Sequence, residues 1–402
     1  MADSLTGSAN RSFPFVQVPV GLGPEDVVYD CANGYVYVAN SDSSNVSVIN
    51  GTHVVGSVNV GLTPVAEVVD SENGEVFVLN LASASVSVIR GTSVVDTVSV
   101  GPGGGQGPSS ATFDPQDGDV YVTGTYGVLS VLNQTSVVGT MDFRLPLGQP
   151  TFDPDDGYVY VPVETSSGPG YEVVMNDTTE VATIPVGPGA GGAAFDSANG
   201  DLYLPNYASG NVSVIHGTAV VASVTVGSWP DQATFDGGNG YVYIGKEGPG
   251  NVSVLDGTAL LGSVVVAASE PAGSTGLSHG TYDNVTGFVY EVRGSSGNVS
   301  VINGTTLAGT VNLGHPPIDE VAVDSQNGYV YVTNSYSNVA VIGASPPASS
   351  SSGLVFGIPM SDAYLILAVV IVAVVLCVAG FAWRKRWSRT PPDSKSTPPP
   401  PR

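Results

Sequence analysis

Basic residues are scarce in this 402-residue chain, which has 11 Lys and Arg against 35 Asp and Glu. Up to residue 360 it contains 33 acidic and five basic residues, a net charge of about −28. Proteins bind nucleic acids mainly through Lys and Arg contacts to phosphates, so this composition argues against a nucleic-acid partner. Cations or basic partners suit the body better, although scattered carboxylates also simply keep a lysine-poor protein soluble.

Residues that typify enzymes and metal sites are also few. The two cysteines, Cys31 and Cys377, leave the body without an intrachain disulfide or a CxxC zinc site. The sequence has no glycine-rich loop ending in Lys-Ser/Thr. The four histidines form no HExxH or HxH pair and are far apart, at His53, His216, His279 and His315. We therefore predict no catalytic residues, no metal site and no cofactor.

One long apolar run is present, at residues 364–383, where 20 residues carry no charge. At 1.5 Å per residue a helix of this length spans a hydrocarbon core of about 30 Å, so we predict a transmembrane helix. Arg384-Lys385-Arg386 follows it, and the positive-inside rule places residues 384–402, a basic Pro-rich tail, in the cytoplasm. Residues 1–343 are then extracellular, joined to the membrane by a Pro/Ser-rich stalk at 344–363.

The N-terminus does not match this topology. An exported body needs a signal peptide, yet residues 1–19 show no basic segment followed by an apolar one. We therefore expect the true start to lie upstream of Met1.

A unit of about 40 residues repeats along the body. Each copy holds four strand-like runs, which in the first copy are residues 27–29, 35–39, 46–49 and 54–60. Four antiparallel strands at this period are typical of β-propeller blades. An Asp-x-x-x-Gly marker identifies eight copies, at Asp30/Gly34, Asp70/Gly74, Asp114/Gly118, Asp153/Gly157, Asp196/Gly200, Asp236/Gly240, Asp283/Gly287 and Asp324/Gly328.

The turns and the ring closure follow from the same alignment. The marker joins the first two strands, with Asp bonding the turn and Gly supplying a positive φ. Between the third and fourth strands, Asn50-Gly51 predicts a two-residue type I′ turn. The last copy stops at Ile342 after its third strand, while residues 15–21 match the fourth strand of the first copy. We expect this N-terminal strand to complete the last blade and to close the ring.

The second strand of each copy carries a recognisable motif. Tyr331-Val332-Thr333-Asn334 resembles the name-giving motif of the YVTN β-propeller repeat family, and Tyr37-Val38-Ala39-Asn40 is a close variant. The resemblance covers residues 24–343. It implies a seven-bladed propeller on an archaeal or bacterial surface, such as a surface-layer protein, with no common reaction. Our count of eight copies leaves seven and eight blades as alternatives.

The mouth of a propeller's channel is its usual binding site. Residues four before the markers occupy equivalent positions on the innermost strands and, with their neighbours, predict an acidic, amide-rich ring suited to a cation, a sugar or a basic peptide. The alternative is that they only solvate a wet channel. The candidates are Asp26, Glu67, Gln149, Asp231, Gln232, His279, Asp319 and Glu320.

Ten Asn-x-Ser/Thr sequons would be glycan acceptors outside a cell, although many arise from an Asn that the repeat places before its third strand. They are Asn10, Asn45, Asn50, Asn133, Asn176, Asn211, Asn251, Asn284, Asn298 and Asn303.

The sequence as a whole favours a membrane-anchored surface propeller that binds ligands or builds the cell envelope. Envelope polymers, other surface proteins and cations are the partners that this location and charge suggest. An extracellular propeller enzyme and a single-pass sensor are the alternatives. This predicted role is based on the architecture and location of the propeller rather than on the chemistry of a site.

Overall fold

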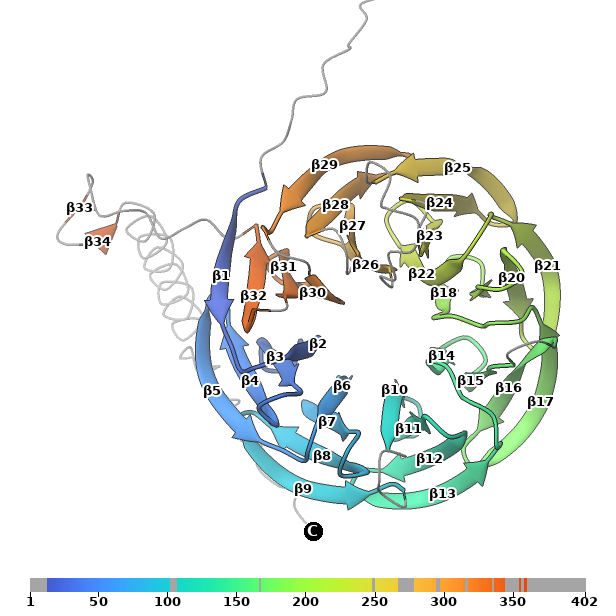
Figure 1. Ribbon diagram of the computed structural model, residues 1–402, viewed down its shortest axis with the longest axis horizontal. Helices are drawn as coiled ribbons and strands as arrows, with labels where there is room; N and C mark the ends of the chain where they lie inside the picture. Colours follow the sequence, from blue (N-terminus) through green and yellow to red (C-terminus); the bar gives the residue numbers. More distant parts are fainter. Residues whose placement is uncertain are drawn as a thin grey trace, which may run out of the picture. The chain divides into compact units, whose positions relative to one another are not determined.

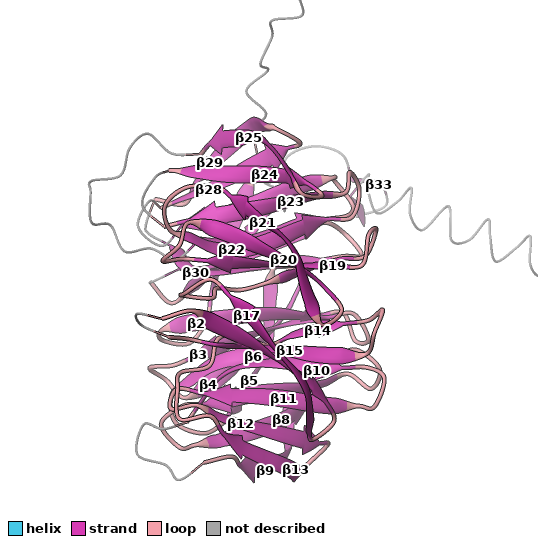
Figure 2. Ribbon diagram, turned by 90° about the vertical axis from the view of Figure 1, so that its right-hand side faces the viewer, coloured by secondary structure: helices cyan, strands magenta, loops and turns pink. Residues whose placement is uncertain are grey.

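The computed structural model describes residues 13–101, 107–165, 168–247, 250–266, 278–293, 297–314, 317–334, 336–343, 354–355 and 358–359. None of these residues is helical. Residues 13–343 form eight four-stranded antiparallel sheets, the blades of a propeller around a central channel (Figure 1). Viewed from the side, the connecting loops gather on the two faces of the disc (Figure 2).

The blades follow one another along the chain, and the first strand of each is innermost (Figure 1). Blade 1 comprises β2 (Pro24–Asp30), β3 (Tyr35–Asn40), β4 (Asn45–Asn50) and β5 (His53–Asn59). Blade 2 comprises β6 (Pro64–Asp70), β7 (Glu75–Asn80), β8 (Ser85–Arg90) and β9 (Ser93–Ser99). Blade 3 comprises β10 (Pro108–Asp114), β11 (Asp119–Gly124), β12 (Val128–Asn133) and β13 (Ser136–Asp142). Blade 4 comprises β14 (Thr151–Asp153), β15 (Tyr158–Val163), β16 (Gly170–Asn176) and β17 (Thr179–Val186).

The second half of the ring repeats this order. Blade 5 comprises β18 (Ala194–Asp196), β19 (Asp201–Asn206), β20 (Asn211–His216) and β21 (Ala219–Thr225). Blade 6 comprises β22 (Pro230–Asp236), β23 (Tyr241–Lys246), β24 (Asn251–Asp256) and β25 (Ala259–Val265). Blade 7 comprises β26 (Ser278–Asp283), β27 (Phe288–Arg293), β28 (Asn298–Asn303) and β29 (Thr306–Asn312). Blade 8 comprises β30 (Pro317–Asp324), β31 (Tyr329–Asn334), β32 (Asn338–Ile342) and β1 (Phe15–Pro19).

The ring closes as predicted. β1 pairs antiparallel with β32, from Phe15 opposite Ile342 to Pro19 opposite Asn338, and supplies the outer strand of blade 8. The blade count is eight, so the seven-bladed alternative is wrong for this chain.

The marker turns also match the prediction. In blade 1, Asp30 Oδ1 accepts a hydrogen bond from the Ala32 N–H at 2.8 Å, and the Gly34 N–H donates to the Asp30 carbonyl at 2.8 Å. The eight marker glycines have φ between +71° and +79°, a conformation that side chains with a Cβ rarely adopt. The marker is therefore a turn motif rather than a ligand-binding loop.

The turn between the third and fourth strands differs from the prediction. Asn50 is the last residue of β4 and pairs with His53, so Gly51 and Thr52 are the turn residues. Gly51 has a φ of +59°, whereas Thr52 is not among the residues with positive φ. A type I′ turn needs positive φ at both central residues, so the geometry is that of type II′.

The YVTN-like motif builds the contacts between blades. Its aromatic residue is almost completely buried in every blade, between neighbouring sheets. Its Asn side chain closes the end of the second strand: in blade 1, Asn40 Nδ2 donates to the Val38 carbonyl at 3.0 Å and to Ser47 Oγ at 3.1 Å. The buried aromatic residues are Tyr37, Phe77, Tyr121, Tyr160, Tyr203, Tyr243, Tyr290 and Tyr331.

The C-terminal part forms a separate unit from residue 347 onward. A two-stranded sheet of β33 (Leu354–Val355) and β34 (Ile358–Pro359) lies within the predicted stalk. The predicted transmembrane helix at 364–383 and the tail at 384–402 lie outside the described residues. Within the described ranges there is no helix with the length and hydrophobicity to cross a membrane.

Candidate functional site

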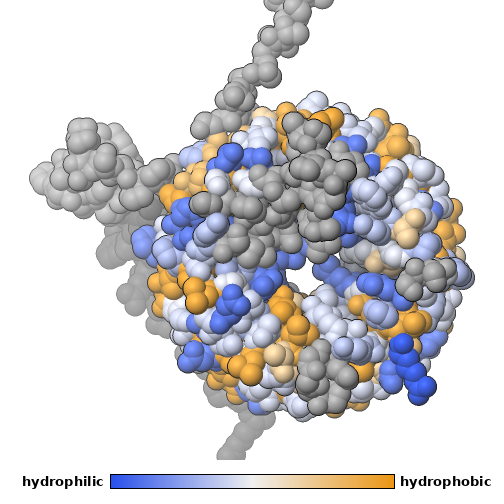
Figure 3. All heavy atoms as spheres, viewed as in Figure 1, coloured by the Kyte–Doolittle hydropathy of each residue, from blue (hydrophilic) through white to orange (hydrophobic). Residues whose placement is uncertain are grey.

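The residues four before the marker Asp lie on the innermost strands or directly ahead of them. They line the channel, whose centre is open in the space-filling view, with hydrophilic residues at its edge (Figure 3). From blade 1 to blade 8 they are Asp26, Ala66, Ser110, Gln149, Gly192, Gln232, His279 and Glu320.

Four of the predicted residues converge on one side of the channel, from blades 2, 1, 8 and 7. Asp26 Oδ2 accepts a hydrogen bond from the Glu67 N–H at 2.5 Å, and its Oδ1 accepts one from the Val27 N–H at 2.7 Å. His279 Nε2 lies 3.5 Å from Glu320 Oε1. The charges of Glu320 and His279 both act on Asp26. We call Glu67, Asp26, Glu320 and His279 the channel acid cluster.

Burial dominates the electrostatics of this cluster. It raises the pKa of Asp26 from 3.8 to about 8, and the charge of Glu320 adds to the rise. The pKa of Glu67 is raised well above 4.5 by burial and by the charge of Asp26. Glu67 is 8% exposed, and neither of its carboxylate oxygens has a hydrogen bond of good geometry. A weaker interaction with the Ala39 backbone opposes the rise of its pKa. The raised pKa favours the protonated form of Asp26 at neutral pH, burial shifts Glu67 in the same direction, and a bound positive charge would favour the ionisation of both.

The spacing of the cluster bears on the kind of cation it suits. Among the described residues, one group of three carboxylates has oxygens within 4.8 Å of one another, and it lies elsewhere, at Asp117, Asp119 and Asp177. The channel acids are thus not preassembled around one metal ion. Their spread over four blades suits an extended ligand with several positive groups.

The remaining predicted residues belong to blades 4, 6 and 8. A Cβ built on Gly192 of blade 5 would come within 1.9 Å of Gln232 Oε1, and the Ala233 N–H donates to the Gly192 carbonyl at 2.9 Å. The Asp231 carbonyl accepts a hydrogen bond from the Gly192 N–H at 2.9 Å. Gln149 is exposed ahead of β14. The Asp319 side chain lies outside the described residues.

Two groups of residues were not predicted. Burial and a hydrogen bond with Asp177 raise the pKa of Asp117 to about 7, in the carboxylate group between blades 3 and 4. In blades 5 and 6, the Tyr207 hydroxyl donates to Glu247 Oε2 beside a small pocket. In both cases the residues come from turns of two successive blades. A comparison of residues within one repeat does not reveal such contacts.

The sequons fall into two structural classes. Asn45 and Asn211 begin third strands and are partly buried, and each accepts a hydrogen bond from the motif Asn of its own blade, at 2.9 and 3.0 Å. Asn251 and Asn298 hold the same position. Asn10 lies outside the described residues. The exposed sequons are Asn50, Asn133, Asn176, Asn284 and Asn303.

No protein-family model and no curated protein matches this chain. Solved structures do resemble it. The C-terminal WD40 domain of Sif2 superposes with a TM-score of 0.66 at 12% identity, covering 84% of this chain and 99% of that one. Hydrazine synthase of Kuenenia stuttgartiensis gives a TM-score of 0.56 at 14% identity, covering 86% and 99%. A streptogramin B lyase gives 0.53 at 11% identity, covering 82% and 97%. At these identities the likeness concerns the fold alone: the chain is an eight-bladed β-propeller.

Proposed function

We propose that this protein is a single-pass membrane protein that displays an acidic β-propeller outside the cell and binds positively charged partners at the channel mouth. The observation that carries the binding role is the channel acid cluster, where Glu67 keeps two buried carboxylate oxygens that have no hydrogen bond of good geometry. Such an arrangement costs stability in the empty protein, and a bound cation would offset the cost. The role is that of a binding module or envelope scaffold rather than of an enzyme.

The topology part of the proposal depends on the sequence. It assigns residues 1–343 to the extracellular body, 344–363 to the stalk, 364–383 to the membrane helix and 384–402 to the cytoplasmic tail. The contrast between the acidic body and the basic tail supports this orientation. Labelling with a membrane-impermeant amine reagent tests the topology: Lys385 and Lys395 of the tail should be modified only after the cells are lysed, whereas protease added to intact cells should release the body.

The binding part is tested by titrating full-length protein in detergent with a lysine pentapeptide and a glutamate pentapeptide. The lysine peptide should bind and the glutamate peptide should not. Exchanging Glu67→Gln and Glu320→Gln together should weaken lysine-peptide binding at least tenfold. The control, Glu72→Gln with Asp96→Asn, removes the same charge from exposed positions and should change affinity less than twofold. Equal losses in both variants would reduce the site to general surface charge.

A further inference from the structure

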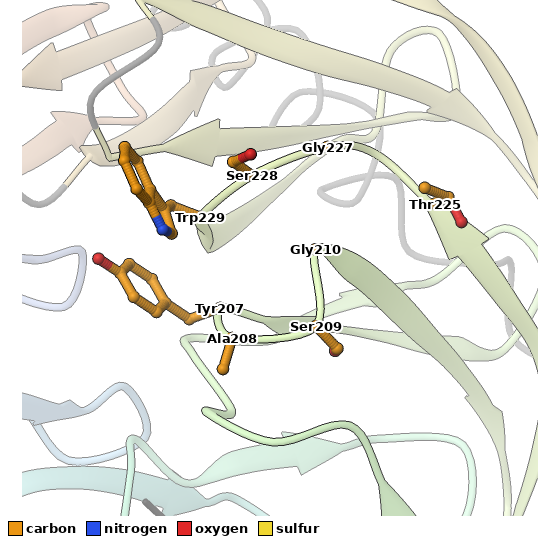
Figure 4. A pocket seen from close by; sticks show the side chains of 8 residues that line it. All are labelled: Tyr207, Ala208, Ser209, Gly210, Thr225, Gly227, Ser228 and Trp229. Atoms are coloured by element: carbon orange, nitrogen blue, oxygen red, sulfur yellow. The ribbon is translucent and has the colours of Figure 1, made fainter. Parts of the chain in front are cut away.

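A second pocket lies between two loops of neighbouring blades, separate from the channel acid cluster. It has a volume of about 280 Å³ and is bounded by residues 207–210, after β19, and by residues 225–229, before β22. Figure 4 shows the phenol ring of Tyr207 and the indole of Trp229 next to each other at one end of the pocket. Trp229 is 47% exposed, so about half of its surface is open to solvent.

The backbone at Trp229 is unusual for a bulky residue. Its φ is +57°, in the left-handed region that a Cβ disfavours. The equivalent positions, each just before or near the start of an innermost strand, are Gly23 at +65°, Thr63 at +55° and Gly189 at +72°. Glycine meets the requirement of this turn without strain. Because Trp229 is half exposed, packing does not explain why a tryptophan occupies the position.

Two carboxylates stand beside the aromatic pair. The Tyr207 hydroxyl donates a hydrogen bond to Glu247 Oε2, and the Glu247 N–H donates to the Trp229 carbonyl at 3.0 Å. This hydrogen bond, with burial, raises the pKa of Tyr207 to about 12, and the charges of Glu247 and Asp231 act in the same direction. The two rings are therefore linked through Glu247, with negative charge next to them and a neutral phenol throughout the physiological range.

A buried lysine lies beside the backbone of the pocket. Lys246 Nζ donates to the Val226 carbonyl at 2.5 Å, and a Cβ built on the lining residue Gly227 would be 3.7 Å from it. Burial lowers the pKa of this ammonium group.

We propose that the pocket lined by Tyr207 and Trp229 binds an organic cation, an alkylated or primary ammonium group held against the aromatic faces. Glu247, which accepts the hydrogen bond of the Tyr207 hydroxyl, is its counter-charge. Aromatic faces attract ammonium groups through the ring quadrupole, and a nearby carboxylate reinforces the attraction. A neutral sugar is the other ligand that stacks on such rings, and the experiment separates the two.

Calorimetric titration of the full-length protein, in a polyoxyethylene detergent that carries neither sugar nor choline groups, compares choline with its uncharged isostere 3,3-dimethylbutan-1-ol and with methyl glucoside. Choline should bind at least tenfold more tightly than either. Equal binding of the isostere, or tighter binding of the glucoside, would overturn the assignment to a cation.

The variants locate the site. Trp229→Gly should weaken choline binding at least tenfold while leaving the melting temperature unchanged or higher, because glycine suits this φ. Glu247→Gln should weaken it several-fold. Thr63→Gly, the same backbone change in blade 2, is the matched control and should leave choline binding unaltered. Binding that survives Trp229→Gly would contradict the proposal.

The proposals for this pocket and for the channel acid cluster can be tested independently of each other. The Glu67→Gln, Glu320→Gln variant should keep choline binding while losing the lysine peptide, and Trp229→Gly should keep the lysine peptide. Choline binding that disappears with the channel variant alone would refute the pocket and leave the channel site standing.

Discussion

Glu67 of blade 2 lies three residues before its marker Asp, the position that Val27 holds in blade 1. Blade 2 therefore has a carboxyl group where blade 1 has a buried apolar side chain. Because burial raises its pKa in the folded protein, the protonated form is the one that the fold tolerates. Its contribution to stability is fully present below the pKa of the unfolded chain and is lost as the pH rises through the higher folded value.

Exchanging Glu67→Gln should therefore stabilise the protein at pH 8, by about 1–3 kcal/mol, since it removes a buried charge without a partner. At pH 4, where the carboxyl is protonated in both states, the change should be close to zero. Thermal unfolding from pH 4 to pH 8 measures this, with Glu72→Gln as the exposed control. A variant whose melting temperature shifts equally at both pH values would contradict the assignment.

The motif asparagines act at the scale of one strand and its neighbour. Asn40 donates to carbonyl and side-chain oxygens of β3, β4 and the turn between them. Asn40→Ala leaves several of these buried groups unpaired and should destabilise the protein by about 2–3 kcal/mol. Asn50→Ala, at an exposed turn, should change stability by less than about 0.5 kcal/mol. Chemical denaturation compares the two, and similar losses would show that the motif Asn has no special structural role.

The difference between Asn side chains that bond within a blade and those at exposed turns also applies to the sequons. If the body is exported to a glycosylating environment, occupancy should be confined to exposed turn positions such as Asn50 and Asn303 and should be absent at Asn45 and Asn211, whose side chains bond within the blade. Glycopeptide mass spectrometry on protein from the native source tests this. Glycans at Asn45 or Asn211 would be incompatible with the strand geometry.

Most of the strands could be predicted because each repeat carries its own turn residues and its own alternating strand pattern. Asp30 and Gly34 fix the first turn through one hydrogen bond and one positive φ, and both are visible in the sequence. The type of the next turn was wrong because the strand extends through Asn50, which the Asn-Gly pattern does not reveal. Gln232 lies on the innermost strand of blade 6, and its contact with Gly192 depends on the absence of a side chain in the previous blade.

The Tyr207 and Trp229 pocket could not be predicted from the pattern of one repeat. Its residues come from two repeats and are joined through Glu247, so no single copy contains the site. One signal was available: a tryptophan stands where the aligned copies have glycine, threonine or proline. Departures from a repeat are thus more informative about function than the repeat itself.

At the scale of the whole molecule, closure by β1 joins the two ends of the chain. Deleting residues 1–21 should leave blade 8 with three strands and expose the edge of β32, which lowers the melting temperature by 10 °C or more. Deleting residues 1–12, which stops short of the strand, should have little effect. Scanning calorimetry on both deletions tests this, and similar melting temperatures would mean that ring closure contributes little.

The net charge of the body, about −28, acts on all partners at long range and makes electrostatic attraction strongly dependent on salt. A specific channel site differs from this general attraction in one respect: peptide affinity should be lost when the carboxyl groups of Glu67 and Glu320 are removed.

The most direct test of this account is the affinity of the lysine pentapeptide for full-length protein at about 0.1 M salt, compared between the wild type and the Glu67→Gln, Glu320→Gln variant. The account predicts at least a tenfold loss in the variant, with the Glu72→Gln, Asp96→Asn control binding like the wild type. Equal affinities in all three proteins would contradict the claim that the channel mouth is the binding site.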